Sequence, residues 1–296
     1  MHGDGVADLF VAPPSGIGYE INADQQRRTL AGVPLRIVRC FAETWQSRDL
    51  LFMLVVRDVK VRYRAATLGI LWALITPLLS VLIYSLFFGV LGRMGPEGVP
   101  YPIFLFSALL IWSYFEASIG RASNALISSG ALVSKVYFPR QILPVANVIS
   151  PVVDLFFGLV ILVAMLLIYR IEPSRHVLLL PAYFLMAMMA AIGVGLAASV
   201  LNGFYRDVRH FMPVLTRLWF FCSPIIYSVE LVPERWRPLY AVNPMATVCE
   251  GFRSALIGTP PPTVTMIAVS SAVTVTLLIS GVLIFRNHEE TVADYI

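Results

Sequence analysis

Six stretches of this chain carry no charged side chain, and they limit what it can fold into. They cover residues 65–92, 98–115, 155–169, 177–205, 218–229 and 254–285. A helix that crosses a bilayer needs about 20 mostly apolar residues. Three of the stretches reach that length alone, and the other three reach it by extending through Glu116, Asp154 and Arg217. The sequence therefore predicts six membrane-spanning segments. They lie at about 65–92, 100–121, 144–169, 177–201, 208–228 and 263–285.

The composition excludes a soluble domain and favours a chain embedded in lipid. Hydrophobic residues make up 58% of the 296 residues and charged residues only 14%, with a mean hydropathy of +0.77. Soluble domains are typically about 45–50% apolar and about 25% charged. Each spanning segment is expected to be helical, because lipid offers no hydrogen-bond partner to a free backbone N–H or C=O group. The predicted fold class is an all-α integral membrane protein.

Four basic side chains directly precede the first span. They are Arg57, Lys60, Arg62 and Arg64. A nucleic-acid-binding protein concentrates such residues on a polar domain, whereas this chain has a net charge of only +4 and the cluster runs into an apolar segment. We therefore expect no nucleic-acid partner. Lys and Arg near span ends favour the cytoplasmic side, so the cluster predicts a multi-pass protein with both termini in the cytoplasm.

The residues before the first span are predicted to form a tail and a surface helix. Residues 1–34 are polar and look like a mobile tail, without the apolar core and cleavage site of a signal peptide. In residues 35–64, Leu35, Val38, Phe41 and Trp45 recur at three- and four-residue spacing. This pattern indicates an amphipathic helix in the cytoplasmic headgroup layer, followed by the basic anchor. The alternative is a helix that also contacts a cytoplasmic partner subunit. Residues 65–296 form the predicted transmembrane domain.

Two connecting segments are predicted to hold short helices. The segment ALVSKVYF lies between Gly130 and Pro139, and proline ends helical geometry, so a short separate helix is expected there. Residues 223–258 are interrupted by four prolines, yet they are too apolar for a free loop. Short helices that dip back into the membrane from the outer face fit this pattern, because irregular backbone at that depth must be buried in protein or line water. This segment is predicted to form an outer gate.

The chain lacks the residue patterns of common catalytic and metal sites. An ATP-binding P-loop needs Gly-Lys-Ser/Thr, and both lysines, Lys60 and Lys135, are followed by valine. The four histidines are scattered, so no metal site is expected, and no catalytic residues are predicted. Three cysteines cannot form a full disulfide framework. A transporter component is favoured over an enzyme.

Charged and aromatic residues in the spans have both packing and functional interpretations. Glu116, Asp154 and Arg217 are expected to face the bundle interior or water. Asp154 in particular can pair with a polar group on a neighbouring helix, or belong to a proton relay. The aromatic residues can form interface belts and packing contacts, or a lining on which sugar rings slide. Those singled out as a lining are Tyr84, Phe87, Phe88, Trp112, Tyr114, Phe115, Trp219, Phe220 and Tyr227.

Four segments, in this order and spacing, resemble one family of membrane proteins. They are RDVKVRYRAATLGILWALITPLL, KVYFPRQILPVANVISPVVDL, YRDVRHFMPVL and SPIIYS…NPMATVCEGFRSAL. Over roughly residues 35–286 the chain is similar to the permease subunit of ABC-2-type exporters of lipid-linked polysaccharide, such as O-antigen, capsule, teichoic acid or galactan. The resemblance implies an ATP-driven exporter of the bacterial cytoplasmic (inner) membrane.

The resemblance also implies partners. Two copies of the permease would form the channel as a homodimer, and two separate ATPase subunits would bind its cytoplasmic face. ATP and magnesium would then be bound by the partner subunit, with no cofactor in this chain. The helices near 35–48 and 129–138 would be the docking elements. The docking residues carried over are Trp45, Lys135, Tyr137, Phe138 and Arg140.

The resemblance assigns a role to the basic cluster as well. The four cations before the first span would meet the pyrophosphate headgroup of the lipid-linked substrate through charge-assisted hydrogen bonds. Residues 229–257 would form the outer gate helices. Arg217 departs from the family, which more often carries an uncharged residue there, so either the fifth span is shifted or the channel holds an unusual cation.

Two other functions share parts of this pattern. An ABC-2 permease that exports a drug or a lipid would have the same plan, although a wide aromatic-lined channel favours a polymer. A secondary transporter would need no ATPase, and it typically shows inverted repeats with helices broken at mid-membrane. The sequence has no such repeat, and its proline-rich breaks lie near the predicted membrane surfaces.

Overall fold

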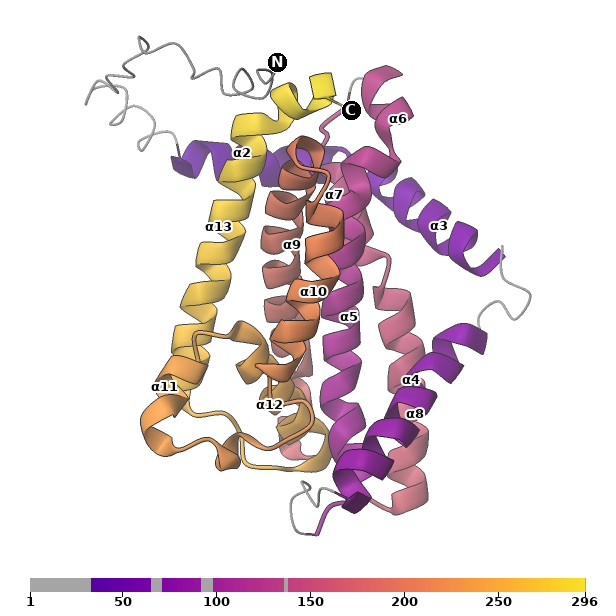
Figure 1. Ribbon diagram of the computed structural model, residues 1–296, viewed down its shortest axis with the longest axis vertical. Coiled ribbons are helices and arrows are strands. Elements are labelled where there is room, and N and C mark those ends of the chain that lie inside the picture. The colour runs from indigo at the N-terminus through magenta and orange to yellow at the C-terminus, as the bar shows by residue number, and fades with distance from the viewer. Residues whose placement is uncertain (1–32, 65–70, 92–97, 136–137, 296) are drawn as a thin grey trace, which may run out of the picture.

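The computed structural model describes residues 33–64, 71–91, 98–135 and 138–295, and throughout them the regular secondary structure is helical (Figure 1). The elements are α2 (Val33–Gln46), α3 (Arg48–Arg64), α4 (Leu71–Tyr84), the π-helix η1 (Ser85–Leu91), α5 (Tyr101–Ser128), α6 (Gly130–Lys135), α7 (Ile142–Ile149), α8 (Val152–Tyr169), η2 (Arg175–Leu179), α9 (Leu180–Phe204), α10 (Val208–Phe221), η3 (Val229–Leu231), η4 (Glu234–Trp236), α11 (Arg237–Tyr240), α12 (Pro244–Ile257) and α13 (Val264–Tyr295). The all-α fold class is confirmed.

Four helical segments are long and apolar enough to cross a membrane. They are Tyr101–Ser128, Ile142–Tyr169, Arg175–Phe204 and Val264–Glu289. These coincide with the second, third, fourth and sixth predicted spans. The first predicted span contains a shorter apolar helix, Ile75–Gly89. At the fifth, α10 ends at Phe221 and turns follow, seven residues before the predicted end. The count of six spans therefore stays a prediction.

Helix α5 lies at the centre of the bundle, with α9, α7, α12 and α8 packed around it. Helices α9 and α13 approach each other closely because glycines stand at their contact. A Cβ atom on Gly281 would lie 2.0 Å from the carbonyl oxygen of Gly193, which is closer than atoms can come. Two small residues thus let two long backbones touch, as is common where membrane helices pack.

Helix α2 lies across one end of the bundle against the C-terminal part of α13, and α6 lies at the same end (Figure 1); we call this the α2 end. Gln141 of the α7 N-terminus donates to the carbonyl oxygen of Cys40 (2.7 Å), and Glu43 forms an ion pair with Arg286 of α13. On its other side α2 leaves Val38, Phe41 and Trp45 exposed. The amphipathic helix is therefore present, with its apolar face turned away from the bundle.

The proline-rich segment after α10 lies at the opposite end, which we call the α11 end (Figure 1). Helix α12 belongs to this segment, yet each of its 14 residues is buried, and it packs against α5, α9 and α13. It begins at Pro244, with the preceding Asn243 side chain accepting a hydrogen bond from the Met245 N–H group. It ends at Ile257, and the next residue, Gly258, has a φ of 74°, which suits glycine. The segment thus contains a short helix inserted into the bundle, as a broken apolar loop predicts.

Replacing Gly281 with valine is expected to separate α9 from α13. The added side chain has no room beside Gly193, and overpacking of this kind typically costs about 1–3 kcal/mol and occasionally more. Thermal unfolding of the purified chain in detergent should show a lower melting temperature. Gly120→Ala is the matched control, because a Cβ atom on Gly120 would meet nothing within 4 Å. Equal melting temperatures for the two variants would contradict the close α9–α13 contact.

Candidate functional site

A cavity of about 450 Å³ lies between α3, α4, α5 and α8. Its polar lining comes from four helices: Arg62 and Tyr63 of α3, Thr76 and Ser80 of α4, Ser113, Tyr114 and Arg121 of α5, and Asp154 of α8. Apolar side chains such as Leu110 and Leu155 line the rest. Arg121 stands seven residues before the end of α5, about 10 Å along its axis, so the cavity lies toward the α2 end. The arrangement is a small, mostly apolar pocket with a few polar groups, which is typical of a ligand site.

Asp154 holds the end of α3 against α8. The Arg62 guanidinium forms an ion pair with one carboxylate oxygen, and the Tyr63 hydroxyl donates to the other. Arg62 also donates from Nη2 to the Ser150 hydroxyl at 3.1 Å. Burial, and then the hydrogen bond to Asp154, raise the pKa of Tyr63 to about 12, so the phenol remains a donor at neutral pH. Asp154 therefore pairs with polar groups of a neighbouring helix.

Arg121 gives the cavity an excess of positive charge. It is half-buried and forms no hydrogen bond or ion pair with another side chain in the described part of the chain. The Nε atom of Arg62 is likewise buried without a partner there. Two guanidinium groups thus face one carboxylate, and their free N–H groups can bind an anion such as phosphate. The sequence prediction missed Arg121, because it stood at the predicted inner end of the second span. The four-residue spacing of Ser113, Ala117 and Arg121 is the signal that could have found it.

The other three cations of the basic cluster lie elsewhere on α3. Arg57, Lys60 and Arg64 are exposed and line a surface depression of about 430 Å³ together with apolar side chains. Arg57 forms an ion pair with its sequence neighbour Asp58 at 2.9 Å. The cluster expected to act as one group is therefore divided, with Arg62 alone in the cavity.

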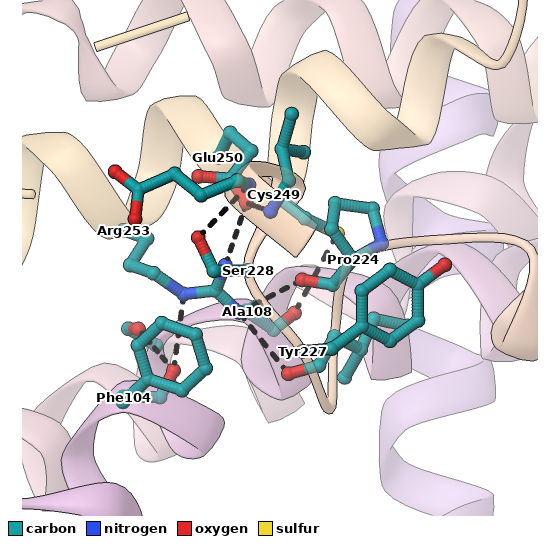
Figure 2. A network of polar contacts seen from close by, with 12 residues as sticks. Phe104, Ala108, Pro224, Tyr227, Ser228, Cys249, Glu250 and Arg253 are labelled. Carbon is teal, nitrogen blue, oxygen red and sulfur yellow. Dashed lines mark hydrogen bonds and ion pairs between the residues drawn. The ribbon is translucent and has the colours of Figure 1, made fainter. Parts of the chain in front are cut away.

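A second polar network lies toward the α11 end, around the fully buried Arg253 of α12 (Figure 2). Its guanidinium donates to Glu250 at 2.8 Å, to the carbonyl oxygens of Pro224 at 2.8 Å and Ile225 at 3.1 Å, and to that of Phe104 at 3.3 Å. It also stacks on the Phe104 ring, 3.7 Å from the ring centroid. One side chain thus satisfies acceptors from α5, α12 and the turn that follows α10.

Glu250 extends this network to the start of η3. Its carboxylate accepts a hydrogen bond from the backbone N–H of Val229 at 3.2 Å, and the Tyr101 hydroxyl of α5 donates to the carbonyl oxygen of Ile226 at 2.9 Å. Residues 224–229 are therefore fastened to two helices through their backbone groups. A buried ion pair of this kind is costly unless each partner makes further hydrogen bonds. Here the carbonyl groups accept from Arg253, and the Val229 N–H donates to Glu250.

Comparison with known proteins gives the family. Residues 49–257 match the ABC-2 type transporter family. The O-antigen export system permease protein RfbA of Myxococcus xanthus is 31% identical over 263 residues, covering 88% of this chain and all of that protein. RfbA of Klebsiella pneumoniae is 30% identical over 206 residues, covering 69% of this chain and 79% of its own length. The polysialic acid transport protein KpsM of Escherichia coli is 23% identical over 244 residues, covering 80% and 92%.

The chain belongs to the ABC-2 type transporter family. The match extends from the start of α3 to the end of α12. It therefore includes both the cavity that holds Arg62 and Arg121 and the network around Arg253. The family expected from the four sequence segments is therefore confirmed, and the protein is an ABC-2 permease.

The docking residues expected in this ABC-2 permease lie at the α2 end. The short helix predicted after the second span is present as α6, directly after α5. Trp45 on α2 is 72% exposed. Phe138 instead packs against a cluster of buried apolar side chains that includes Cys40 of α2. Arg140 donates to the Glu289 carbonyl oxygen at 2.8 Å, so its side chain fastens α13. Tyr137 and the side chain of Lys135 lie outside the described residues.

Most aromatic residues predicted to line a channel contact one another inside the chain. Trp112, Tyr114, Phe115 and Phe220 are buried, Tyr84, Phe88, Trp219 and Tyr227 are half-buried, and Phe87 is exposed. Phe115 meets Trp219 edge to face at 5.1 Å between ring centroids. These contacts join α5 to α10, and a channel-lining role for the aromatic residues stays a prediction.

Removing the Arg253 guanidinium is expected to destabilise the α11 end. Arg253→Met leaves the Glu250 carboxylate buried without its cation, a change that typically costs about 3–5 kcal/mol. Limited proteolysis of the detergent-solubilised protein should cleave within residues 222–243 faster than in the unaltered chain. Arg235→Met is the control, because Arg235 is exposed. The double variant Arg253→Met/Glu250→Leu, which leaves no unpaired charge, should recover part of the resistance. Equal cleavage of all variants would show that the network does not hold this segment.

Proposed function

We propose that this chain is the permease subunit of an ATP-driven exporter that moves a lipid-linked polysaccharide across the bacterial cytoplasmic membrane. The names of the relatives, two O-antigen export system permeases and a polysialic acid transport protein, support this assignment. The observation that carries it in the structure is the cavity with two guanidinium groups against one carboxylate. A lipid-linked polysaccharide presents a phosphate-containing headgroup between an apolar tail and a hydrophilic chain. A cavity of mostly apolar lining with surplus positive charge suits that junction.

The headgroup is expected to contact Arg62 and Arg121. Arg121 is free of an ion pair within the described chain, whereas Asp154 is already paired with Arg62 and Tyr63. At about 450 Å³ the cavity is within the range of about 300–1,000 Å³ typical of ligand pockets. Lys60 and Arg64, on the exposed face of α3, would attract anionic headgroups to the membrane surface, whereas the charge of Arg57 is offset by its ion pair with Asp58.

The transporter is proposed to be a homodimer of this permease with two ATPase subunits, which bind ATP and magnesium. Helix α2, which carries the exposed Trp45, and the short helix α6 both lie at the α2 end. We place this end in the cytoplasm, where the ATPase subunits dock. The α11 end, with α12 inserted into the bundle, then faces outward, and its segment 229–257 acts as the outer gate.

Replacing Arg121 with glutamine is expected to weaken headgroup binding. Loss of a charge-assisted hydrogen bond typically costs about 1.5–3 kcal/mol, which is roughly 10- to 100-fold in affinity. The measurement is stimulation of ATP hydrolysis by a short lipid-linked oligosaccharide, titrated into the complete transporter in nanodiscs. Arg121→Gln should need a correspondingly higher concentration for half-maximal stimulation. Arg57→Gln should lie close to the unaltered protein, because Arg57 already pairs with Asp58 on the surface. The reverse order of the two variants would contradict the assignment of the cavity.

Helix α6 provides the test of docking. Replacing Gly130–Lys135 with a flexible Gly/Ser segment of equal length should abolish co-purification of the ATPase subunit and leave membrane insertion intact. The control replaces the exposed, solvent-facing part of the opposite end, η4, in the same way. A complex that survives the α6 replacement would exclude this helix as the docking element.

A further inference from the structure

One face of α5 is open and polar over the half that is nearer the α2 end. Ser113, Glu116, Gly120, Arg121 and Asn124 recur at spacings of one to four residues that keep them on one side of the helix. Each is exposed or half-buried, whereas the residues between them, such as Ser118, Ile119 and Ala122, are buried in the bundle. We call these five positions the α5 stripe. Ser113 and Arg121 also line the cavity beside Arg62, and Asn124 accepts a hydrogen bond from Asn202 of α9, whereas Glu116 contacts no polar group of the described chain.

Glu116 places a carboxylate near the middle of this helix. It is the sixteenth of the 28 residues of α5. It is exposed, and it forms no hydrogen bond or ion pair with any residue in the described ranges. A charged group at the centre of a bilayer does not face lipid, because hydrocarbon offers it neither water nor a counter-ion. The stripe must therefore face water or protein.

Arg217 of α10 stands at a similar depth. The contacts of Phe115 with Trp219 and of Trp112 with Phe220 show that α10 runs antiparallel to α5 and put Arg217 within about a turn of Glu116. Arg217 is also exposed, and it forms no ion pair within the described residues. Two opposite charges at one depth, neither paired with the other, indicate a hydrated space beside α5 and α10.

Gly120 shows that the space beside the α5 stripe is open. A Cβ atom added to Gly120 would meet nothing within 4 Å. At Gly158 of α8 the same atom would lie 2.1 Å from the Leu110 side chain, and at Gly193 of α9 it would lie 2.4 Å from a backbone oxygen. Gly120 therefore does not serve close helix packing.

The open face ends toward the α11 end. Residues 103–112 of α5 are all buried. There Tyr84 of α4 stacks on Phe220 of α10, with ring centroids 5.9 Å apart, and Phe220 contacts Trp112 of α5 at 5.7 Å. Helices α4 and α10 thus meet over α5 through aromatic rings, and the polar face begins at the next residue, Ser113.

We propose that the α5 stripe is the hydrated wall of the translocation path, open toward the α2 end and closed by the Tyr84–Phe220–Trp112 contact. Glu116 accepts hydrogen bonds from hydroxyl groups of a passing glycan, and Arg217 donates to its oxygens. The glycan as occupant rests on the proposed function, whereas the hydrated wall rests on the charges and the open space. Water competes for each of these hydrogen bonds, so the polymer binds weakly at any one position and can slide.

Cysteine labelling of the complete transporter in inside-out vesicles tests the wall. In a Cys222→Ser background, which removes the exposed native cysteine, Ser113→Cys, Glu116→Cys and Gly120→Cys should react with a membrane-impermeant maleimide. Val160→Cys is the control: it is 53% exposed, lies halfway along α8, and shares its face with exposed apolar side chains. It should stay unlabelled, because a thiol in hydrocarbon does not ionise. Stripe cysteines that react no faster than the Val160→Cys control would overturn the proposal. So would stripe cysteines that are shielded from the reagent and form cross-links between two copies of the permease.

Steric block of the path gives a second readout. Gly120→Phe should reduce polysaccharide export at least tenfold and leave binding of the ATPase subunit unchanged, whereas Gly120→Ala should export normally. Normal export by Gly120→Phe would overturn the assignment of the path. Labelling of the stripe does not depend on the cargo. A stripe that reacts as expected, in a transporter that exports no polysaccharide, would therefore contradict the proposed function and leave the hydrated wall in place.

Discussion

The structure depends on one constraint: a charged group in this bundle needs either a partner or water. Three sites meet it in different ways. Arg253 is fully buried and satisfied by Glu250 and by carbonyl groups of two segments, α5 and the turn after α10. Asp154 is shared by Arg62 and Tyr63. Glu116 and Arg217 have no partner in the described chain, and they lie on exposed faces of adjacent helices. The first two sites hold elements together, and the third marks where water is needed.

These sites divide the protein along its length. At the α11 end the Arg253 network fastens residues 224–229 to the buried α12. Near the α2 end the ion pair between α3 and α8 leaves a cavity with a surplus arginine. Between them α5 changes from a helix buried on every side to one with an open polar face. The proposed path, open toward the α2 end and closed toward the α11 end, would suit an exporter at rest.

The sequence predicted the elements better than it predicted their contacts. Charge-free runs located the four long apolar helices, because a span must be both long and uncharged, and prolines marked α6 and the broken segment before α12. The fifth predicted span was too long, since its apolar run continues through residues 222–229, where the structure makes turns. Apolar character says where a segment is buried and cannot say whether it is helical there.

The candidate site was harder to predict, because it joins residues distant in sequence. Asp154 pairs with Arg62 across 92 positions, and no spacing rule connects them. The four cations before the first span form one cluster in sequence, but successive positions on a helix point in different directions, so only Arg62 enters the cavity. Arg121 was missed for a related reason: a span boundary drawn at a charged residue treats that residue as an end marker.

The most direct test of the central claim is transport by the purified system. The permease and its ATPase subunit would be reconstituted in proteoliposomes with the lipid-linked polymer of the source strain, and arrival of the polymer on the far side would be measured with an impermeant glycosidase or lectin. Transfer should require ATP hydrolysis and both subunits, and it should be insensitive to collapse of ion gradients. Transfer by this chain alone, driven by an ion gradient, would contradict the assignment as an ABC-2 polysaccharide permease.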